Sequence, residues 1–235
     1  MSFKSLDALL DPRKIIPHYV SRVNTNKDIH FPISAEFHWT SNCNYDCIHC
    51  SYGSRRQTTN YLTSEIIETL IKDLIDMSCK AVYLSGGGEP TIIKKWDTYT
   101  NQLVSGGIEV ALITNGVAIL DKHIDTIRKM NYVAVSVYST QEDRYKEITG
   151  SRFFNRQFSL PKNIKSRKSN TIVGARCVLN KTNYDELYEI YCSAINAGFD
   201  YIIFIPAVDY EGRGIFLEDR WINYVQRSII EMFDK

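Results

Sequence analysis

The stretch YVAVSVYS at residues 132–139 alternates valine with alanine, serine and tyrosine, so an extended chain here carries one apolar face and one mixed face. The stretch TIVGARCVL at residues 171–179 alternates in the same way and puts Arg176 on its mixed face. A strand buried on both sides of a doubly wound sheet is apolar throughout. The mixed faces suit the lining of a polar, ligand-filled interior, and they favour a partial barrel over a doubly wound sheet.

The same kind of short apolar run, followed by a helical stretch, recurs about every 30 residues along the chain. We expect strands at 34–40, 81–85, 109–114, 132–139, 171–179 and 201–205. Helices are expected at 64–78, 96–105, 120–130, 141–149, 155–167, 184–197 and 217–233. Strict alternation predicts parallel strands joined by right-handed helical crossovers. Six such units fall short of a closed eight-unit barrel, so the expected fold class is α/β, a partial (β/α)6 TIM-type barrel.

Composition fits one ordinary globular domain: 235 residues, 44% hydrophobic and 23% charged. The net charge of +1 provides no overall field that would attract nucleic acid. The chain has no apolar stretch of about 18 residues, as a membrane span requires, and no apolar secretory core at its start. We therefore expect a cytoplasmic protein without nucleic-acid or membrane partners. Residues 1–33 are predicted to be an N-terminal extension, and residues 34–235 the barrel.

Three of the six cysteines, Cys43, Cys47 and Cys50, lie in the loop after the first expected strand, with the spacing C-x3-C-x2-C. Loops at the carboxyl ends of parallel strands are where α/β proteins build active sites. Structural zinc normally takes four ligands in two pairs, and no second pair completes this run. Three thiolates suit a cubane iron–sulfur cluster with one iron left open. The remaining cysteines, Cys79, Cys177 and Cys192, are expected to be small core residues.

With Thr40 and Asn44 the cysteine run reads T-x2-C-N-x2-C-x2-C, which resembles the radical S-adenosylmethionine (radical SAM) superfamily. LSGGGEP at residues 84–90 resembles the GGE motif of that superfamily. TNG at 114–116 and VSV at 135–137 follow in the order found in relatives that modify peptides. The resemblance covers residues 34–233, and its nearest branch is the one that modifies peptides and natural products.

The resemblance implies a [4Fe-4S] cluster and S-adenosyl-L-methionine as cofactors. In the family, an electron from the cluster cleaves S-adenosylmethionine to a 5′-deoxyadenosyl radical, and that radical abstracts hydrogen from the substrate. Cys43, Cys47 and Cys50 would bind the cluster. The implied cofactor-binding residues are His49, Gly87, Gly88, Glu89, Asn115, Ser136, Arg176 and Val208. Asn115 is equally suited to capping the turn that follows it.

Each implied contact has a physical reason. The glycines allow backbone to approach the cofactor, and the Glu89 carboxylate can accept from its cationic amino group. His49 would present its backbone to the adenine edge, and Val208 would flank the ring. Ser136 is suited to hydrogen-bond the ribose or the carboxylate. Arg176 is suited to pair with a carboxylate of cofactor or substrate, provided that its strand phase is right.

The expected function is therefore radical SAM chemistry on a peptide or a small natural-product precursor, with an external flavodoxin-like or ferredoxin-like electron donor. The alternative is a non-catalytic iron–sulfur electron-transfer or binding protein on the same barrel. The GGEP turn favours the enzyme, since an electron carrier needs no group that accepts from a cofactor amine. Relatives often add a C-terminal segment that closes the barrel, and we expect the chain up to Lys235 to lack one. It would then be a minimal enzyme, one portion of a longer protein, or a barrel that its substrate or a partner closes.

Overall fold

Six strands form one sheet in the computed structural model, which describes residues 16, 20, 32–53 and 60–233. The strands are β1 (Ser34–Phe37), β2 (Ala81–Leu84), β3 (Glu109–Thr114), β4 (Tyr132–Ser136), β5 (Ile172–Leu179) and β6 (Tyr201–Pro206). All six expected strands are confirmed. β1 and β4 end three residues earlier than expected, although the backbone N–H of Val137 still donates to the Arg176 carbonyl at 2.9 Å.

The strands lie in chain order, β1-β2-β3-β4-β5-β6, and every neighbouring pair is parallel. A doubly wound sheet changes direction at a switch point, so its strand order departs from chain order. This sheet never changes direction, and β1 and β6 form its two edges. The fold is therefore a partial α/β barrel. Chain order also brings all the loops that follow strands to one rim.

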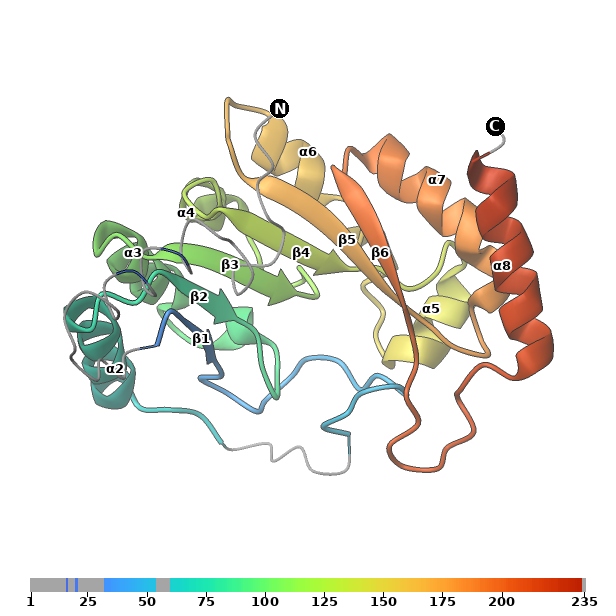
Figure 1. Ribbon diagram of the computed structural model, residues 1–235, viewed down its shortest axis with the longest axis horizontal. Helices are drawn as coiled ribbons and strands as arrows, with labels where there is room; N and C mark the ends of the chain where they lie inside the picture. The colour runs from blue at the N-terminus through green and yellow to red at the C-terminus, as the bar shows by residue number, and fades with distance from the viewer. Residues whose placement is uncertain (1–15, 17–19, 21–31, 54–59, 234–235) are drawn as a thin grey trace.

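Helices cover the outside of the curved sheet in sequence order, except for α5, which lies at the carboxyl ends of the strands, as Figure 1 shows. They are α2 (Ser64–Asp76), α3 (Trp96–Ser105), α4 (Ile124–Ile127), α5 (Glu142–Thr149), α6 (Leu160–Lys165), α7 (Leu187–Ala197) and α8 (Asp219–Phe233). Short 3₁₀ segments are η1 (Pro90–Ile92), η2 (Asp121–His123), η3 (Phe154–Arg156) and η4 (Tyr184–Glu186). The stretch expected to be helical at 155–167 divides into η3 and α6, and Pro161 lies in the first turn of α6.

The main core lies between the sheet and these helices. Val133, Val135 and Val137 are fully buried there, as the alternation of their stretch predicts. On the helix side, Thr63 caps α2 by accepting from the Ile66 N–H, and Ile67 begins the apolar stripe that packs inward. The opposite face of the sheet carries the mixed side chains and surrounds the interior of the barrel.

Most of the expected N-terminal extension, residues 1–33, lies outside the described residues. In the part of the chain that the structure describes, no helix combines the length and the apolar character needed to cross a bilayer.

Candidate functional site

A cavity of about 360 Å³ opens at the carboxyl ends of the strands. Its lining comes from the loop after β1, the turn after β2 and the ends of β3 to β6. Of the residues expected to bind a cluster or cofactor, the lining includes Cys43, Cys47, Cys50, His49, Gly88, Glu89, Asn115, Ser136 and Arg176. Residues that lie as far apart in sequence as Cys43 and Arg176 therefore share one site.

The cysteine loop is held against the end of α5. The backbone N–H of Asp46 donates to the Thr149 carbonyl at 2.8 Å, and that of Ile48 donates to the Ile148 carbonyl at 2.9 Å. These bonds fix the middle of the loop. Cys47 is buried, whereas Cys43 and Cys50 are half-buried at the cavity wall.

The three thiols of this loop do not surround a single point. Among the described residues, no three Cys, His, Asp or Glu side chains converge as ligands of a single ion would. A cubane cluster makes a different demand, because each cysteine binds its own iron at a separate corner. Three thiols spread over the wall of one cavity fit that demand. Tetrahedral zinc would need its ligands around one point.

The GGEP turn after β2 packs directly on the cysteine loop. A Cβ on Gly88 would overlap the carbonyl group of Asn42, so only glycine fits there. The next residue, Glu89, donates its backbone N–H to that same carbonyl at 2.8 Å. Glycine is thus required at position 88 because the GGEP turn and the cysteine loop touch there.

The Glu89 carboxylate is buried and already has several protein donors. Oε1 accepts from the Thr91 N–H at 3.0 Å, from the Thr91 hydroxyl at 2.5 Å and from the Thr114 hydroxyl at 2.6 Å. Oε2 accepts from the Asn115 N–H at 2.8 Å. Burial raises the pKa of the Glu89 carboxyl, while these hydrogen bonds act to lower it. The carboxylate therefore links the GGEP turn to the end of β3, a role that the sequence analysis did not foresee.

Asn115 takes the capping role weighed for it, and its contact with the cofactor stays a prediction. Its Oδ1 accepts from the Val117 N–H at 3.0 Å, which caps the turn after β3. Its Nδ2 donates to Asn44 Oδ1 at 2.7 Å, so it also contacts the cysteine loop from within the cavity lining. The end of β3 and the loop after β1 are joined through this side chain.

Ser136 and Arg176 face the cavity from adjacent strands, β4 and β5, where they are paired in register. The strand phase expected for Arg176 is thereby confirmed. The Arg176 guanidinium forms no ion pair with any carboxylate among the described residues. An unpaired guanidinium on a cavity wall is suited to bind an anionic group of a ligand.

Gly87 and Val208 lie outside the lining of this cavity. Gly87 lines a neighbouring hollow together with Tyr52, and Val208 is 57% exposed beyond the end of β6. Ile205, inside β6, forms the apolar wall of the cavity on that side. The contacts expected of Gly87 and Val208 with the cofactor stay predictions.

His49 reaches the cavity wall with its imidazole ring. Burial lowers the pKa of this side chain to about 4, so the ring is neutral near pH 7. Its Nδ1 atom is buried and has no hydrogen-bond partner among the described residues. The ring packs against Tyr138, with 5.2 Å between the ring centroids. A buried polar atom without a partner at the edge of a cavity fits a site that receives a polar ligand.

Several lining residues were not among the expected site residues: Tyr45, Ser51, Tyr52, Ser85, Gly86, Ile113, Thr114, Tyr138, Val178 and Ile205. The alternation of β4 does put Tyr138 on the inner face, two residues beyond Ser136. Of the three cysteines expected to be core residues, two are confirmed, because Cys79 and Cys177 are buried in the main core. Cys192 is only half-buried in α7.

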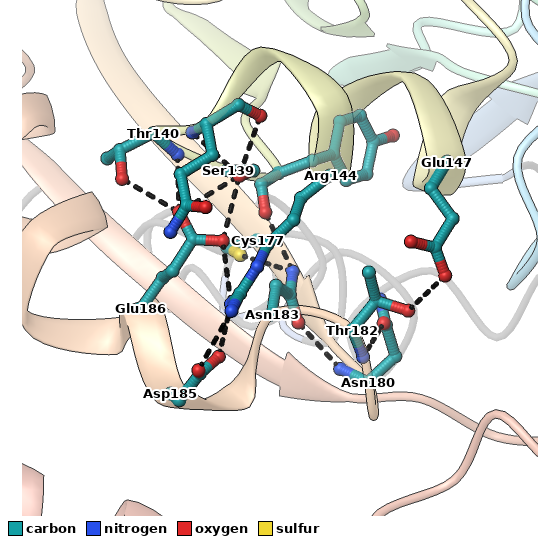
Figure 2. Close-up of polar contacts among 12 residues, drawn as sticks. Ser139, Thr140, Arg144, Glu147, Cys177, Asn180, Thr182, Asn183, Asp185 and Glu186 are labelled. Atoms are coloured by element: carbon teal, nitrogen blue, oxygen red, sulfur yellow. Dashed lines mark hydrogen bonds and ion pairs between the residues drawn. The ribbon is translucent and has the colours of Figure 1, made fainter.

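A polar network fixes the chain just beyond β4 (Figure 2). The buried Glu186 carboxylate accepts from the Ser139 hydroxyl at 2.8 Å, the Thr140 N–H at 2.8 Å and the Thr140 hydroxyl at 2.7 Å. Arg144 from α5 joins Glu186 at 3.2 Å and also pairs with Asp185. This network ties the rim after β4 to η4 at the start of α7.

Comparisons with known proteins agree with this geometry. GTP 3′,8-cyclase of Clostridium botulinum (strain Okra / Type B1) is 26% identical over 200 residues, which cover 78% of this chain and 59% of that protein. Mycofactocin maturase MftC of Mycolicibacterium smegmatis is 24% identical over 201 residues, which cover 85% and 50%. The chain therefore spans between half and three fifths of the length of these relatives.

The fold has a counterpart among solved structures. Streptococcus suis SuiB bound to the precursor peptide SuiA superimposes with a TM-score of 0.70 at 19% identity, covering 96% of this chain and 53% of that one. At this identity the likeness shows the fold alone. The family model described as the radical SAM superfamily matches residues 38–192, which include the cysteine run, the GGEP turn, Ser136 and Arg176. The chain belongs to the radical SAM superfamily.

Proposed function

We propose that this protein binds a [4Fe-4S] cluster through Cys43, Cys47 and Cys50 and uses it to cleave S-adenosylmethionine reductively. The observation that carries the proposal is that the three thiols line one cavity together with the GGEP turn and the polar side chains of β4 and β5. When bound, the cluster supplies an electron to the sulfonium, and the resulting 5′-deoxyadenosyl radical abstracts a hydrogen atom from substrate.

The residues of the chain would hold and orient the cofactor. Arg176 offers a guanidinium to the carboxylate of the methionyl group, and Ser136 offers a hydroxyl beside it. His49 offers its unpartnered Nδ1 and its backbone to the adenine side. Glu89 acts mainly through its hydrogen bonds to Thr114 and Asn115, which hold the turn in place. Gly87 and Val208 would contact the cofactor from beyond the lining of this cavity.

For the substrate we propose a peptide or a small natural-product precursor. The support comes from relatives: the name of MftC denotes a maturase, and SuiB is known in structures with S-adenosylmethionine and with its precursor peptide. The electron would come from an external donor of the flavodoxin or ferredoxin type. The open rim of the partial barrel leaves room for a substrate that is larger than the cavity.

The test is anaerobic. The cluster is reconstituted, S-adenosylmethionine and dithionite are added, and 5′-deoxyadenosine is measured by chromatography. Wild-type protein should form 5′-deoxyadenosine, and Cys47→Ala should form none. Cys192→Ala is the matched control, because it removes a half-buried thiol from α7, outside the cavity lining. A fully loaded wild-type protein that forms no product would contradict the proposal.

The substrate class needs a second measurement. Candidate precursor peptides encoded beside the gene, prepared with deuterium at side-chain carbons, are incubated with the active protein. Transfer of deuterium into 5′-deoxyadenosine would identify the peptide as the hydrogen donor. A small metabolite that transfers deuterium, while every neighbouring peptide fails to do so, would reject the peptide and leave the cleavage reaction standing.

A further inference from the structure

Tyr138 reaches one of the three cysteines from the far side of the barrel. Its Oη lies 3.9 Å from Cys47 Sγ, and both side chains are buried. The two residues are 91 positions apart in the sequence. Because both lie in the cavity lining, the phenol is a neighbour of the proposed cluster site, although Tyr138 was not among the expected site residues.

The backbone of Tyr138 is held on both sides by fully buried amides. Its N–H donates to Gln157 Oε1 at 3.0 Å, and its carbonyl accepts from Asn183 Nδ2 at 2.8 Å. Gln157 also donates from Nε2 to the Ser139 carbonyl at 2.9 Å. Figure 2 shows that Glu186, three residues after Asn183, binds the next residues of this segment, Ser139 and Thr140. The Cα of Tyr138 is therefore fixed relative to β5 and α7.

The ring itself is packed between aromatic neighbours. It lies against His49, as described above, and its centroid is 6.4 Å from that of Tyr145 in a tilted arrangement. Tyr138 is 6% exposed. A ring confined in this way keeps its hydroxyl directed at one place, which is what a positioning hydrogen bond requires.

The chemistry of a bound cysteine determines the direction of the hydrogen bond. Cysteine binds iron as a thiolate, which has no proton and can only accept. The phenol O–H is then the donor between the two atoms. Burial raises the pKa of the Tyr138 phenol, so the phenol keeps its proton.

We propose that Tyr138 donates a hydrogen bond to the Cys47 thiolate of the bound cluster and thereby raises the reduction potential of that cluster. This inference rests on the proposed function. Reduction adds negative charge to the cluster, and a donor to a ligand sulfur stabilises that charge. Tyr138 is thus a positioning residue for the first electron transfer and takes no part in the chemistry on the substrate.

The experiment compares Tyr138→Phe with wild type and with Tyr145→Phe after anaerobic reconstitution. Tyr145 is a fair control, because it is buried in the same aromatic group and its hydroxyl contacts Tyr45. The midpoint potential of the cluster is measured by titration monitored with electron paramagnetic resonance. We expect Tyr138→Phe to shift the potential to a more negative value and Tyr145→Phe to leave it near wild type.

A second readout follows the proton directly. The reduced proteins are prepared in D2O, and electron–nuclear double resonance measures exchangeable deuterons coupled to the cluster. One coupling present in wild type and in Tyr145→Phe should be missing from Tyr138→Phe. A general loss of aromatic packing in the variant would not remove a single deuteron coupling and leave the others unchanged.

The outcomes separate this inference from the proposed function. Equal potentials and equal deuteron couplings in all three proteins would overturn the role of Tyr138, even if wild type cleaves S-adenosylmethionine. Equal negative shifts in both variants would also overturn it, because they would reveal a general effect of the aromatic group. A wild-type protein that binds no [4Fe-4S] cluster would instead refute the proposed function itself.

Discussion

Gly88 and Asn42 lie in such close contact that the glycine has no room for a Cβ, and the Asn42 carbonyl accepts from the next N–H along the turn. This contact joins the cysteine loop to the GGEP turn. The position of the thiols relative to β2 depends on it, because the loop and the turn reach the rim from different strands.

Gly88→Ala is expected to destabilise the fold by about 1–3 kcal/mol, because the methyl group must push two backbones apart. Thermal unfolding of the metal-free protein measures the effect. Gly87→Ala is the control for stability, since a Cβ there meets the Tyr52 ring at 3.4 Å, an ordinary contact. Equal melting temperatures for the two variants would show that the two loops do not touch as described.

Glu186→Gln should lower the free energy of unfolding by about 2–4 kcal/mol. An amide group at this position must turn its NH2 toward the Thr140 N–H or toward Arg144, and either choice sets donor against donor. Urea titration provides the measurement. Asp185→Asn removes the more exposed partner of Arg144 and should cost clearly less; a larger loss in Asp185→Asn would contradict the importance assigned to the buried carboxylate.

His123 makes stability depend on pH. Burial lowers its pKa below the ordinary value of 6.5, and its Nδ1 accepts from the Leu120 N–H at 3.1 Å, which requires an unprotonated nitrogen. Below about pH 6.5 the unfolded chain gains a proton that the folded chain resists. The free energy of unfolding therefore falls as pH drops through that value.

The variant His123→Phe tests this dependence. It keeps a ring against Trp96, whose centroid lies 5.0 Å from that of His123. Urea titrations at pH 7.5 and pH 5.5 should show a smaller decline for the variant than for wild type. Parallel declines would show that His123 titrates normally in the folded protein.

Arg176→Gln should weaken the binding of an anionic ligand in the cavity. A hydrogen bond to a charged partner contributes about 1.5–3 kcal/mol, so the affinity of cluster-loaded protein for S-adenosylmethionine is expected to fall by roughly 10- to 100-fold. Equilibrium binding measures the loss. Arg167→Gln removes an exposed charge outside the cavity lining and should leave the affinity unchanged. An unchanged affinity in Arg176→Gln would reassign the guanidinium to the substrate or to no ligand.

Local patterns predicted much of this architecture because the relevant forces act locally. Alternation within β4 and β5 was enough to place Val135 against the helices and Arg176 toward the interior. The motif around Cys43 placed the thiols on a loop beyond β1. The mixed faces of β4 and β5 favoured a partial barrel, in which the strands follow chain order, and the structure confirms that order.

Contacts between distant loops could not be predicted in this way. The donors to Glu89 come from Thr91, Thr114 and Asn115, and nothing in their spacing shows that they surround one carboxylate. The approach of Tyr138 to Cys47 depends on how the cysteine loop folds over the rim.

The sequential strand order also puts the residues needed for packing and the residues needed for ligand binding in different parts of the barrel. Side chains that determine the core face the helices, and side chains that line the cavity stand on the other face or in the loops of one rim. Rim loops other than the cysteine loop and the GGEP turn, which are locked together through Gly88 and Asn42, can change in length and composition without disturbing the packing beneath the helices. Relatives with different substrates can thus diverge at the rim while keeping the same sheet, and grafting rim loops between them is a practical route to altered specificity.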